Sequence, residues 1–205
     1  MTRAILLASG LIALAAIWAG PLPRLAPGRF SAHMAMHMGV VAVAAPLIAL
    51  GLAGGRFDPS RRYPALFNPI AASVFELGAV WGWHAPLLHH AARHATGALI
   101  AEQLTFLAAG LWLWIAAFGA GRGARLERAW TGVAGLLFTS VHMTLLGAVF
   151  VLTPRALYAT ATTPEALWEQ HLGGGIMLLV GGASYLAGGL WLTVQGLERR
   201  EERTA

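Results

Sequence analysis

The chain has 205 residues, of which 57% are hydrophobic and 11% charged, and its mean hydropathy is +0.63. This composition excludes an ordinary soluble domain and predicts a membrane protein with several spanning helices. The net charge of +5 comes from 14 arginines and no lysine. Because these arginines lie in short loops without interleaved aromatic residues, the expected surroundings are a lipid bilayer, with no nucleic acid as partner.

Six apolar stretches reach or approach the ~20 residues that a spanning helix needs. In chain order they run over residues 4–20, 33–54, 66–88, 96–119, 129–152 and 172–197. We therefore predict an all-α fold, a polytopic membrane helix bundle of six transmembrane helices in a single domain over residues 1–205. The first stretch also resembles a secretory signal peptide, but its length and the aromatic Trp18 near its end favour a retained anchor.

The arginines predict the orientation of the bundle. Ten of them lie at the amino terminus, in the second and fourth loops and in the carboxyl-terminal tail, and four lie on the opposite side. The positive-inside rule then makes both termini cytoplasmic and turns the first, third and fifth loops outward. We expect a multi-pass protein of the bacterial inner membrane.

The histidines gather at the outward ends of the predicted helices, and the chain has no cysteine. A single histidine on an apolar helix is more often a packed or interfacial residue than a ligand. Eight on one side, with methionines beside several of them, favour a metal site that faces the periplasm or exterior. The eight are His33, His37, His84, His89, His90, His94, His142 and His171.

The segment from Ser31 to Met38 carries the first pair. His33 and His37 are one helical turn apart and share a face, Met36 flanks them, and Met34 and Met38 form an adjacent stripe. Thioether sulfur favours Cu(I), and imidazole also binds copper, so the mixture points to copper. The alternative is that the methionines fill gaps in the bundle and the histidines are interfacial.

The second group brackets the outward turn between the third and fourth stretches. His84 is expected just inside the third helix, with Pro86 perturbing the last turn of that helix. The other three, His89, His90 and His94, are expected in the turn or at the entry to the next helix. They are either ligands or an exposed rim.

Two glutamates fall inside predicted spans, where an ionisable residue indicates function. Glu102 lies in the outer third of its stretch and is expected to orient a ligating histidine or to ligate directly. Glu76 precedes His84 by eight residues, which places it ~12 Å deeper, and we interpret it as a proton-handling or packing group.

Ligands from four helices are therefore expected to converge. His142 comes from the fifth stretch, and His171 opens the sixth, just before Gly173–Gly175, which would allow close approach of helices. The candidate metal ligands are His33, His37, Met36, His84, His142, His171, Glu102, His89, His90, His94, Met34 and Met38. No catalytic residue is predicted.

Several spaced motifs resemble the CtaG family of cytochrome c oxidase assembly factors, the multi-span group linked to caa-type oxidases. They are His33-Met34-x-Met36-His37, Trp83-His84-x-Pro86, the stretch from Gly147 to Tyr158, and Glu169-Gln170-x-x-Gly173-Gly174-x-Ile176-Met177. The resemblance implies a metallochaperone without enzymatic activity that delivers or retains copper for haem-copper oxidase. Its implied partners are oxidase subunits or other copper-handling proteins. The chain departs from the expected pattern at Gln103, in place of histidine, and at Glu169, in place of aspartate.

Two other functions also fit histidines near one membrane surface. A membrane cytochrome needs only two imidazoles to bind a b-type haem. The spacing of His90 and His94 is compatible with a membrane zinc hydrolase, but such sites usually add carboxylates, and the only aspartate, Asp58, is predicted on the other side. Copper handling ranks first, haem binding second and hydrolysis third.

Overall fold

The computed structural model describes residues 2–120 and 125–204, with side chains at 2–120 and 126–198. Arg122, one of the arginines counted for topology, lies outside this part, as do the side chains of Arg125, Arg199, Arg200 and Arg203. The described residues form helices and contain no strand, which confirms the all-α fold. The elements are α1 (Thr2–Ala19), α2 (Leu22–Leu25), α3 (Phe30–Met38), the π-helix η1 (Gly39–Ala44), α4 (Ala45–Leu52), α5 (Pro59–Arg62), the 3-10 helix η2 (Pro64–Leu66), α6 (Pro69–Trp83), α7 (Pro86–His94), α8 (Thr96–Phe118), α9 (Arg125–Leu152), α10 (Pro164–Ile176), the π-helix η3 (Met177–Gly181) and α11 (Gly182–Thr204).

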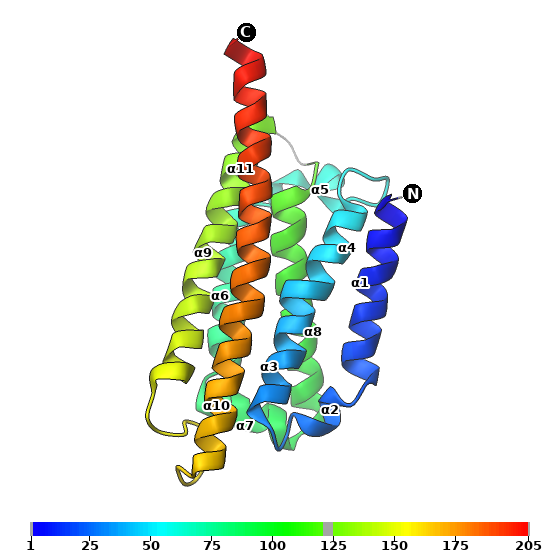
Figure 1. The fold of residues 1–205 in the computed structure, drawn as a ribbon. Helices are drawn as coiled ribbons and strands as arrows, with labels where there is room; N and C mark the ends of the chain where they lie inside the picture. Colours follow the sequence, from blue (N-terminus) through cyan, green and yellow to red (C-terminus); the bar gives the residue numbers. More distant parts are fainter. Residues whose placement is uncertain (1, 121–124, 205) are drawn as a thin grey trace.

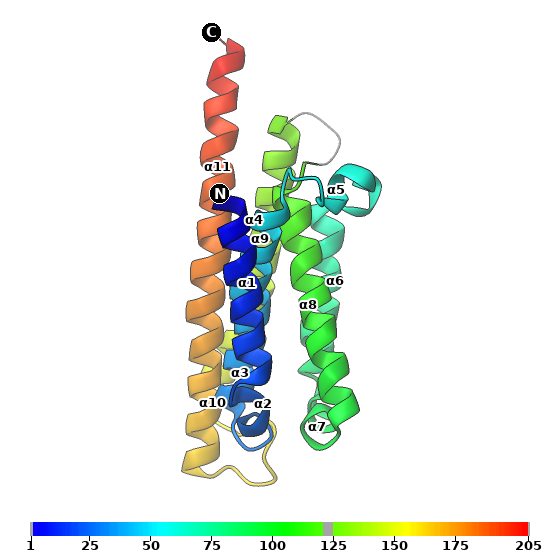
Figure 2. The ribbon, with the colours of Figure 1, turned by 90° about the vertical axis from the view of Figure 1, so that its right-hand side faces the viewer.

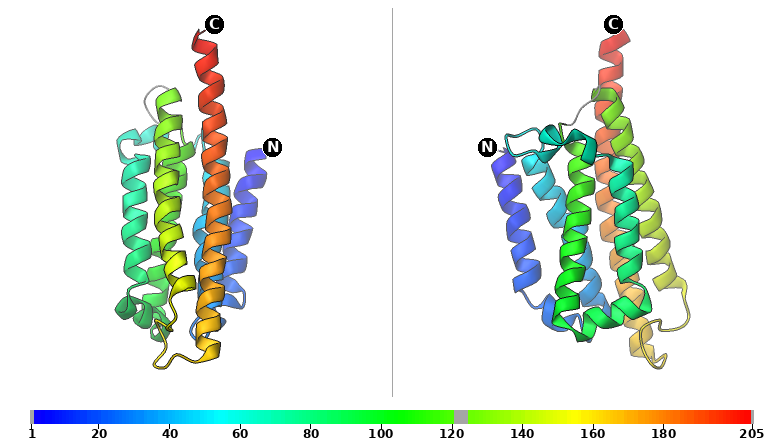
Figure 3. Two further views of the ribbon diagram at one scale, coloured as in Figure 1. Left: turned by 60° about the vertical axis from the view of Figure 1, so that its left-hand side comes forward. Right: turned by 180° about the vertical axis from the view of Figure 1, so that it is seen from behind.

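The long helices run side by side, and both termini lie at the same end of the bundle (Figure 1). Helix α1 flanks α4, as a quarter turn of the molecule shows (Figure 2). From behind, α6 lies between α8 and α9 (Figure 3). The short helices α2 and α7 and the beginning of α10 lie at the end opposite the termini.

Five of the six predicted spans have a helix long and apolar enough to cross a membrane. The exception is α6, whose 15 residues rise only ~22 Å against a hydrocarbon core of ~30 Å. Nevertheless α6 packs against both α8 and α9 within the bundle. The chain is a multi-pass membrane protein.

Two predicted boundaries were wrong. We expected the third helix to continue to residue 88, with Pro86 in its last turn, but α6 ends at Trp83 and Pro86 begins the separate helix α7. Ala85 is extended, with ψ 138°, as is favoured before proline. The last helix begins at Pro164 rather than near residue 172, because the Thr163 side chain accepts a hydrogen bond from the amide of Ala166 and caps α10.

Glycines let the helices approach closely near the candidate site. A Cβ added at Gly174 would lie 2.8 Å from Cβ of Phe150, and one at Gly173 would lie 2.5 Å from Cδ1 of Phe30. Gly175, in contrast, has no atom within 4 Å of its added Cβ. The predicted close packing is confirmed for two of the three glycines.

Asp58 connects two segments at the end of the bundle that carries the termini. Its carboxylate accepts hydrogen bonds from the amides of Gly54 (2.7 Å), Ala120 (2.9 Å) and Ser60 (2.9 Å), and from the Ser60 hydroxyl (2.6 Å). Burial raises the pKa of Asp58, but these hydrogen bonds outweigh it and lower the pKa overall. The aspartate therefore stays charged and joins the loop after α4 to the end of α8.

Candidate metal centre

Four histidines meet inside the bundle at the end opposite the termini. His33 and His37 come from α3, His84 follows α6 directly, and His89 lies on α7. Each side chain is buried, with at most 5% exposed. Their ring centroids lie 5.0 Å apart for His33 and His89, 5.3 Å for His84 with each of His33 and His37, and 6.4 Å for His33 and His37. Helix α3 and the consecutive elements α6 and α7, about 50 residues later in the chain, thus form one imidazole cluster.

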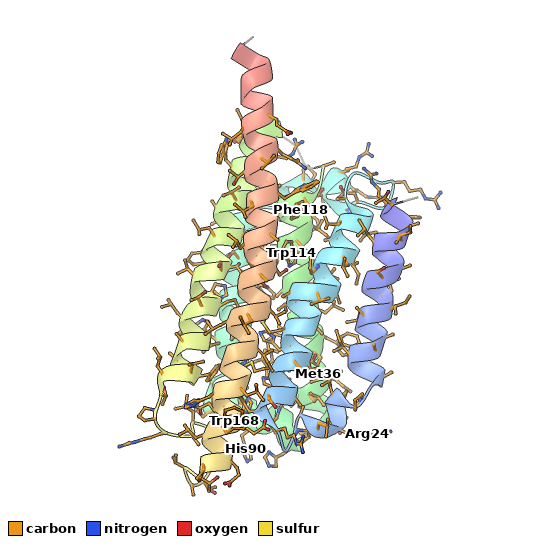
Figure 4. All side chains as sticks on the ribbon, viewed as in Figure 1. Arg24, Met36, His90, Trp114, Phe118 and Trp168 are labelled. Atoms are coloured by element: carbon orange, nitrogen blue, oxygen red, sulfur yellow. The ribbon has the colours of Figure 1, made fainter. Side chains whose placement is uncertain are left out.

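The histidines of helix α7 lie on two different faces of the helix. His89 and Arg93 are one turn apart and buried, because they lie on the inner face. His90 and His94 lie on the outer face, where they are exposed and their rings stack at 3.9 Å. His90 and His94 therefore form an exposed pair outside the cluster, near the end of the bundle where Figure 4 labels His90.

Aromatic rings enclose the four imidazoles. Phe106 lies 4.1 Å from His37, and Tyr158 stacks on His89 with centroids 3.9 Å apart. The Tyr158 hydroxyl donates a hydrogen bond of 2.7 Å to the backbone carbonyl of His84. Phe30 and Phe150 complete the wall, so that the cluster lies in a largely apolar environment. No sequence pattern assigned these aromatic residues to the site, since their ring contacts join segments that are far apart in sequence.

A buried ion pair borders the cluster. Arg93 donates hydrogen bonds to the Glu102 carboxylate and, over 2.7 Å, to Nδ1 of His33. Oε2 of Glu102 lies 3.8 Å from that same Nδ1 and also accepts a hydrogen bond from Gln103. Glu102 thus lies near a candidate ligand, as expected for a carboxylate that orients a histidine. The hydrogen bond to Nδ1 of His33, however, comes from Arg93. Arg93 was counted only for topology, although its spacing of four from His89 places both on one face.

The hydrogen bonds fix two histidine tautomers. Arginine only donates, so Nδ1 of His33 accepts and its proton is on Nε2. Nδ1 of His84 lies 2.6 Å from the carbonyl of Val80, to which it donates, leaving a lone pair on Nε2. The two Nε2 atoms are 3.3 Å apart, and His33 donates across this gap to His84. The lone pair on Nε2 of His84 therefore accepts from His33, and Nε2 of His33 has no lone pair to offer.

Other buried imidazole nitrogens of the described residues have no hydrogen-bond partner. They are both ring nitrogens of His37, both ring nitrogens of His142, and Nδ1 of His89. His142 lies on α9 and is buried, with 4% of its surface exposed. Burial, with Arg93 close by, lowers the pKa of His89 to about 3, so this ring is neutral at physiological pH. Buried polar atoms without partners are uncommon in proteins and indicate a ligand or water.

The remaining sequence candidates lie away from the cluster. His171 is half-buried, with Nε2 3.5 Å from the carbonyl of Thr153. Met36 lines an apolar cavity beside Trp18, Cγ of Met34 lies against Gly173, and Sδ of Met38 lies close to Gly181. The three methionines thus pack against other helices. As the side chains stand, no group of three or more histidines and carboxylates among the described residues is arranged to hold a metal ion.

A cavity of about 560 Å³ lies beside the cluster, at the end opposite the termini. Its lining includes Arg29, His89, His90, Arg93 and Tyr158. Because His89 and Arg93 belong both to this lining and to the buried site, the cavity borders the imidazole cluster.

Glu76 belongs to a separate polar group deeper in the bundle. Its carboxyl accepts hydrogen bonds from the hydroxyls of Thr139 (3.0 Å) and Tyr185 (3.1 Å), and Thr139 is bonded to Ser73 (2.5 Å). This group joins α6, α9 and α11. The interpretation of Glu76 as a packing residue therefore has structural support.

Comparisons with known proteins give one match. The family described as cytochrome c oxidase caa3 assembly factor (Caa3_CtaG) matches residues 1–199. No curated protein and no solved structure matches the chain. With almost its whole length covered by that match, the chain belongs to the Caa3_CtaG family of cytochrome c oxidase assembly factors.

Proposed function

We propose that this family member binds copper at the cluster of His33, His37, His84 and His89 and thereby supports maturation of the copper centres of haem-copper oxidase. The observation that carries the proposal is the meeting of these imidazoles in a buried, aromatic-walled site where several ring nitrogens lack partners. Such nitrogens are costly to bury unless something else binds them.

The geometry of the closest pair suits a metal ion. Metal–nitrogen bonds of ~2.05 Å to two atoms 3.3 Å apart enclose an angle of ~107°, close to tetrahedral. His84 carries its lone pair on Nε2, where a metal ion would replace the N–H of His33, and a backbone carbonyl holds its other nitrogen, which is the usual support for a ligating histidine. His37 and His89 have free nitrogens to complete the coordination.

Copper is the metal that the donor set and the family favour together. Imidazole suits copper, and the site contains no thiol that oxidation would consume. The arginine distribution supports a site at the periplasmic side, because the cluster lies opposite the arginine-rich end. The cavity beside His89 would then open toward oxidase subunits or other copper-handling proteins.

Copper content of the purified full-length protein tests the ligand set. We expect bound copper to fall in His84→Ala and in the double variant His33→Ala, His37→Ala. The matched control is His90→Ala, His94→Ala, which removes two exposed imidazoles from the same end and should leave the copper content unchanged. Equal copper content in wild type and the three variants would contradict the ligand assignment. A Soret band corresponding to one haem per chain would instead identify the protein as a cytochrome.

Deletion of the gene tests the role in assembly. Oxidase activity should fall while the oxidase polypeptides remain, and added copper should restore part of the activity by mass action. The His84→Ala variant should resemble the deletion. Full oxidase activity in the deletion strain under copper limitation would refute the proposed function.

A further inference from the structure

We infer that Arg93 and a single Cu(I) ion alternate as the positive charge beside Glu102, and that Arg93 keeps His33 from ligating until the exchange takes place. This inference rests on the proposed function, which it extends to the oxidation state of the ion and the control of its binding. Three observations carry it: the tautomer of His33, the charge balance of the buried site, and the cavity next to Arg93.

The tautomer makes His33 unable to ligate as it stands. Its Nδ1 accepts from Arg93, so its Nε2, the atom 3.3 Å from Nε2 of His84, bears the proton. To bind metal through Nε2, His33 must carry its proton on Nδ1, which is incompatible with the guanidinium donor 2.7 Å away. Arg93 must therefore withdraw before His33 and His84 can hold one ion together.

Glu102 is in place to accept a hydrogen bond from Nδ1–H of His33. When Arg93 withdraws, Nδ1–H of His33 can donate to Oε2 of Glu102, 3.8 Å away, and Oε1 of the same carboxylate has no partner. The result is a carboxylate–histidine–metal arrangement, the usual support of a ligating imidazole. One proton leaves Nε2 and one binds Nδ1, so the protonation of His33 is unchanged overall.

The charge balance selects a monovalent ion. Glu102 is fully buried and the Arg93 side chain is 5% exposed, so their charges compensate each other in an apolar environment. A metal ion added to this pair would leave an uncompensated buried charge, which is unfavourable in free energy. Exchange of Arg93 for Cu(I) keeps the sum at zero, whereas exchange for Cu(II) leaves one excess positive charge.

The cavity beside the cluster can accommodate the Arg93 side chain. It lines the outer cavity of about 560 Å³, whose lining also includes the carboxylates Glu165 and Glu169, and its Nε has no partner within the described chain. A change of rotamer toward that cavity would take the guanidinium from the buried carboxylate to a solvated region. The same movement would open a route from the cavity to His33.

The affinity of the full-length protein for Cu(I) tests this exchange, measured by competition with a chromogenic Cu(I) chelator. Arg93→Leu removes the competing charge and donor without adding a copper ligand, and it should tighten Cu(I) binding by about tenfold or more, because the buried Glu102 charge is then compensated only by the ion. Arg29→Leu is the matched control, because it removes from the same cavity an arginine whose side chain has no bond to His33 or Glu102. Its Cu(I) affinity should equal that of wild type.

Nitrogen-15 NMR of the histidines in wild type provides a test that does not depend on the stability of a variant. Without copper, His33 should have a protonated Nε2 and an unprotonated Nδ1, and Cu(I) should reverse this. Unchanged or weaker binding by Arg93→Leu, an equal gain in Arg29→Leu, or a His33 that already carries its proton on Nδ1 would each overturn the inference, even if copper binding still requires His84. Absence of copper binding by wild type would overturn the proposed function and, with it, this inference.

Discussion

Gly173 of α10 offers a sharp test of how tightly the site is packed. In Gly173→Ala the new Cβ would lie 2.5 Å from Cδ1 and 2.7 Å from Cε1 of Phe30. Carbon atoms in contact lie about 3.5–4.0 Å apart, so the ring must move by about 1 Å. The Phe30 ring in turn contacts His33, His89, Phe150 and Tyr158, and this leaves it little freedom to yield.

Overpacking of this kind costs about 1–3 kcal/mol of unfolding free energy. The cost can be measured by titrating the protein from mild detergent into denaturing detergent and following tryptophan fluorescence. Gly175→Ala is the matched control on the same helix, because no atom lies within 4 Å of its added Cβ, and its unfolding free energy should stay within about 0.5 kcal/mol of wild type. A second change, Phe30→Leu, should recover part of the loss in Gly173→Ala. The reasoning fails if Gly173→Ala and Gly175→Ala are equally stable.

Three further outcomes are expected. Glu76→Leu should lower the unfolding free energy by about 1–3 kcal/mol, because it leaves two buried hydroxyls without their acceptor. Glu76→Gln keeps an acceptor oxygen and should lower the unfolding free energy less. Equal losses in the two variants would show that these hydrogen bonds contribute little. Because the pKa of Asp58 is lower in the folded protein than its ordinary value of 3.8, its charge stabilises the fold above that pH, and the contribution is lost as the pH falls through the folded pKa. Acid titration of unfolding should therefore show a smaller loss in Asp58→Asn than in wild type, and parallel curves would contradict this. Tyr158→Phe removes the hydrogen bond to the His84 carbonyl but keeps the ring on His89, so it should lower the unfolding free energy by about 1 kcal/mol. Tyr158→Ala, which also removes the ring, should lower it more. Equal losses in the two variants would show that the ring contributes nothing beyond the hydroxyl.

Sequence patterns predicted the bundle well and the site only in part. Hydropathy located the long helices, because an apolar stretch of about 20 residues has few other uses. It misplaced the ends of two helices, since local proline and capping chemistry decides where a helix stops. Helical spacing predicted the shared face of His33 and His37, and the same rule applied to α7 would have separated His89 and Arg93 from His90 and His94. The ion pair of Arg93 with Glu102 depends on how α7 packs on α8, which no local pattern encodes.

The polar group around Glu76 has a consequence for biosynthesis. Its partners Thr139 and Tyr185 lie 63 and 109 residues later in the chain, so they are made well after α6. A carboxyl residue at the centre of a helix raises the apparent free energy of membrane insertion by ~2.5–3.5 kcal/mol, and α6 has only 15 residues to offset it. We therefore expect stable integration of α6 to follow the synthesis of α9 and α11, and truncation before α9 to leave this helix poorly inserted.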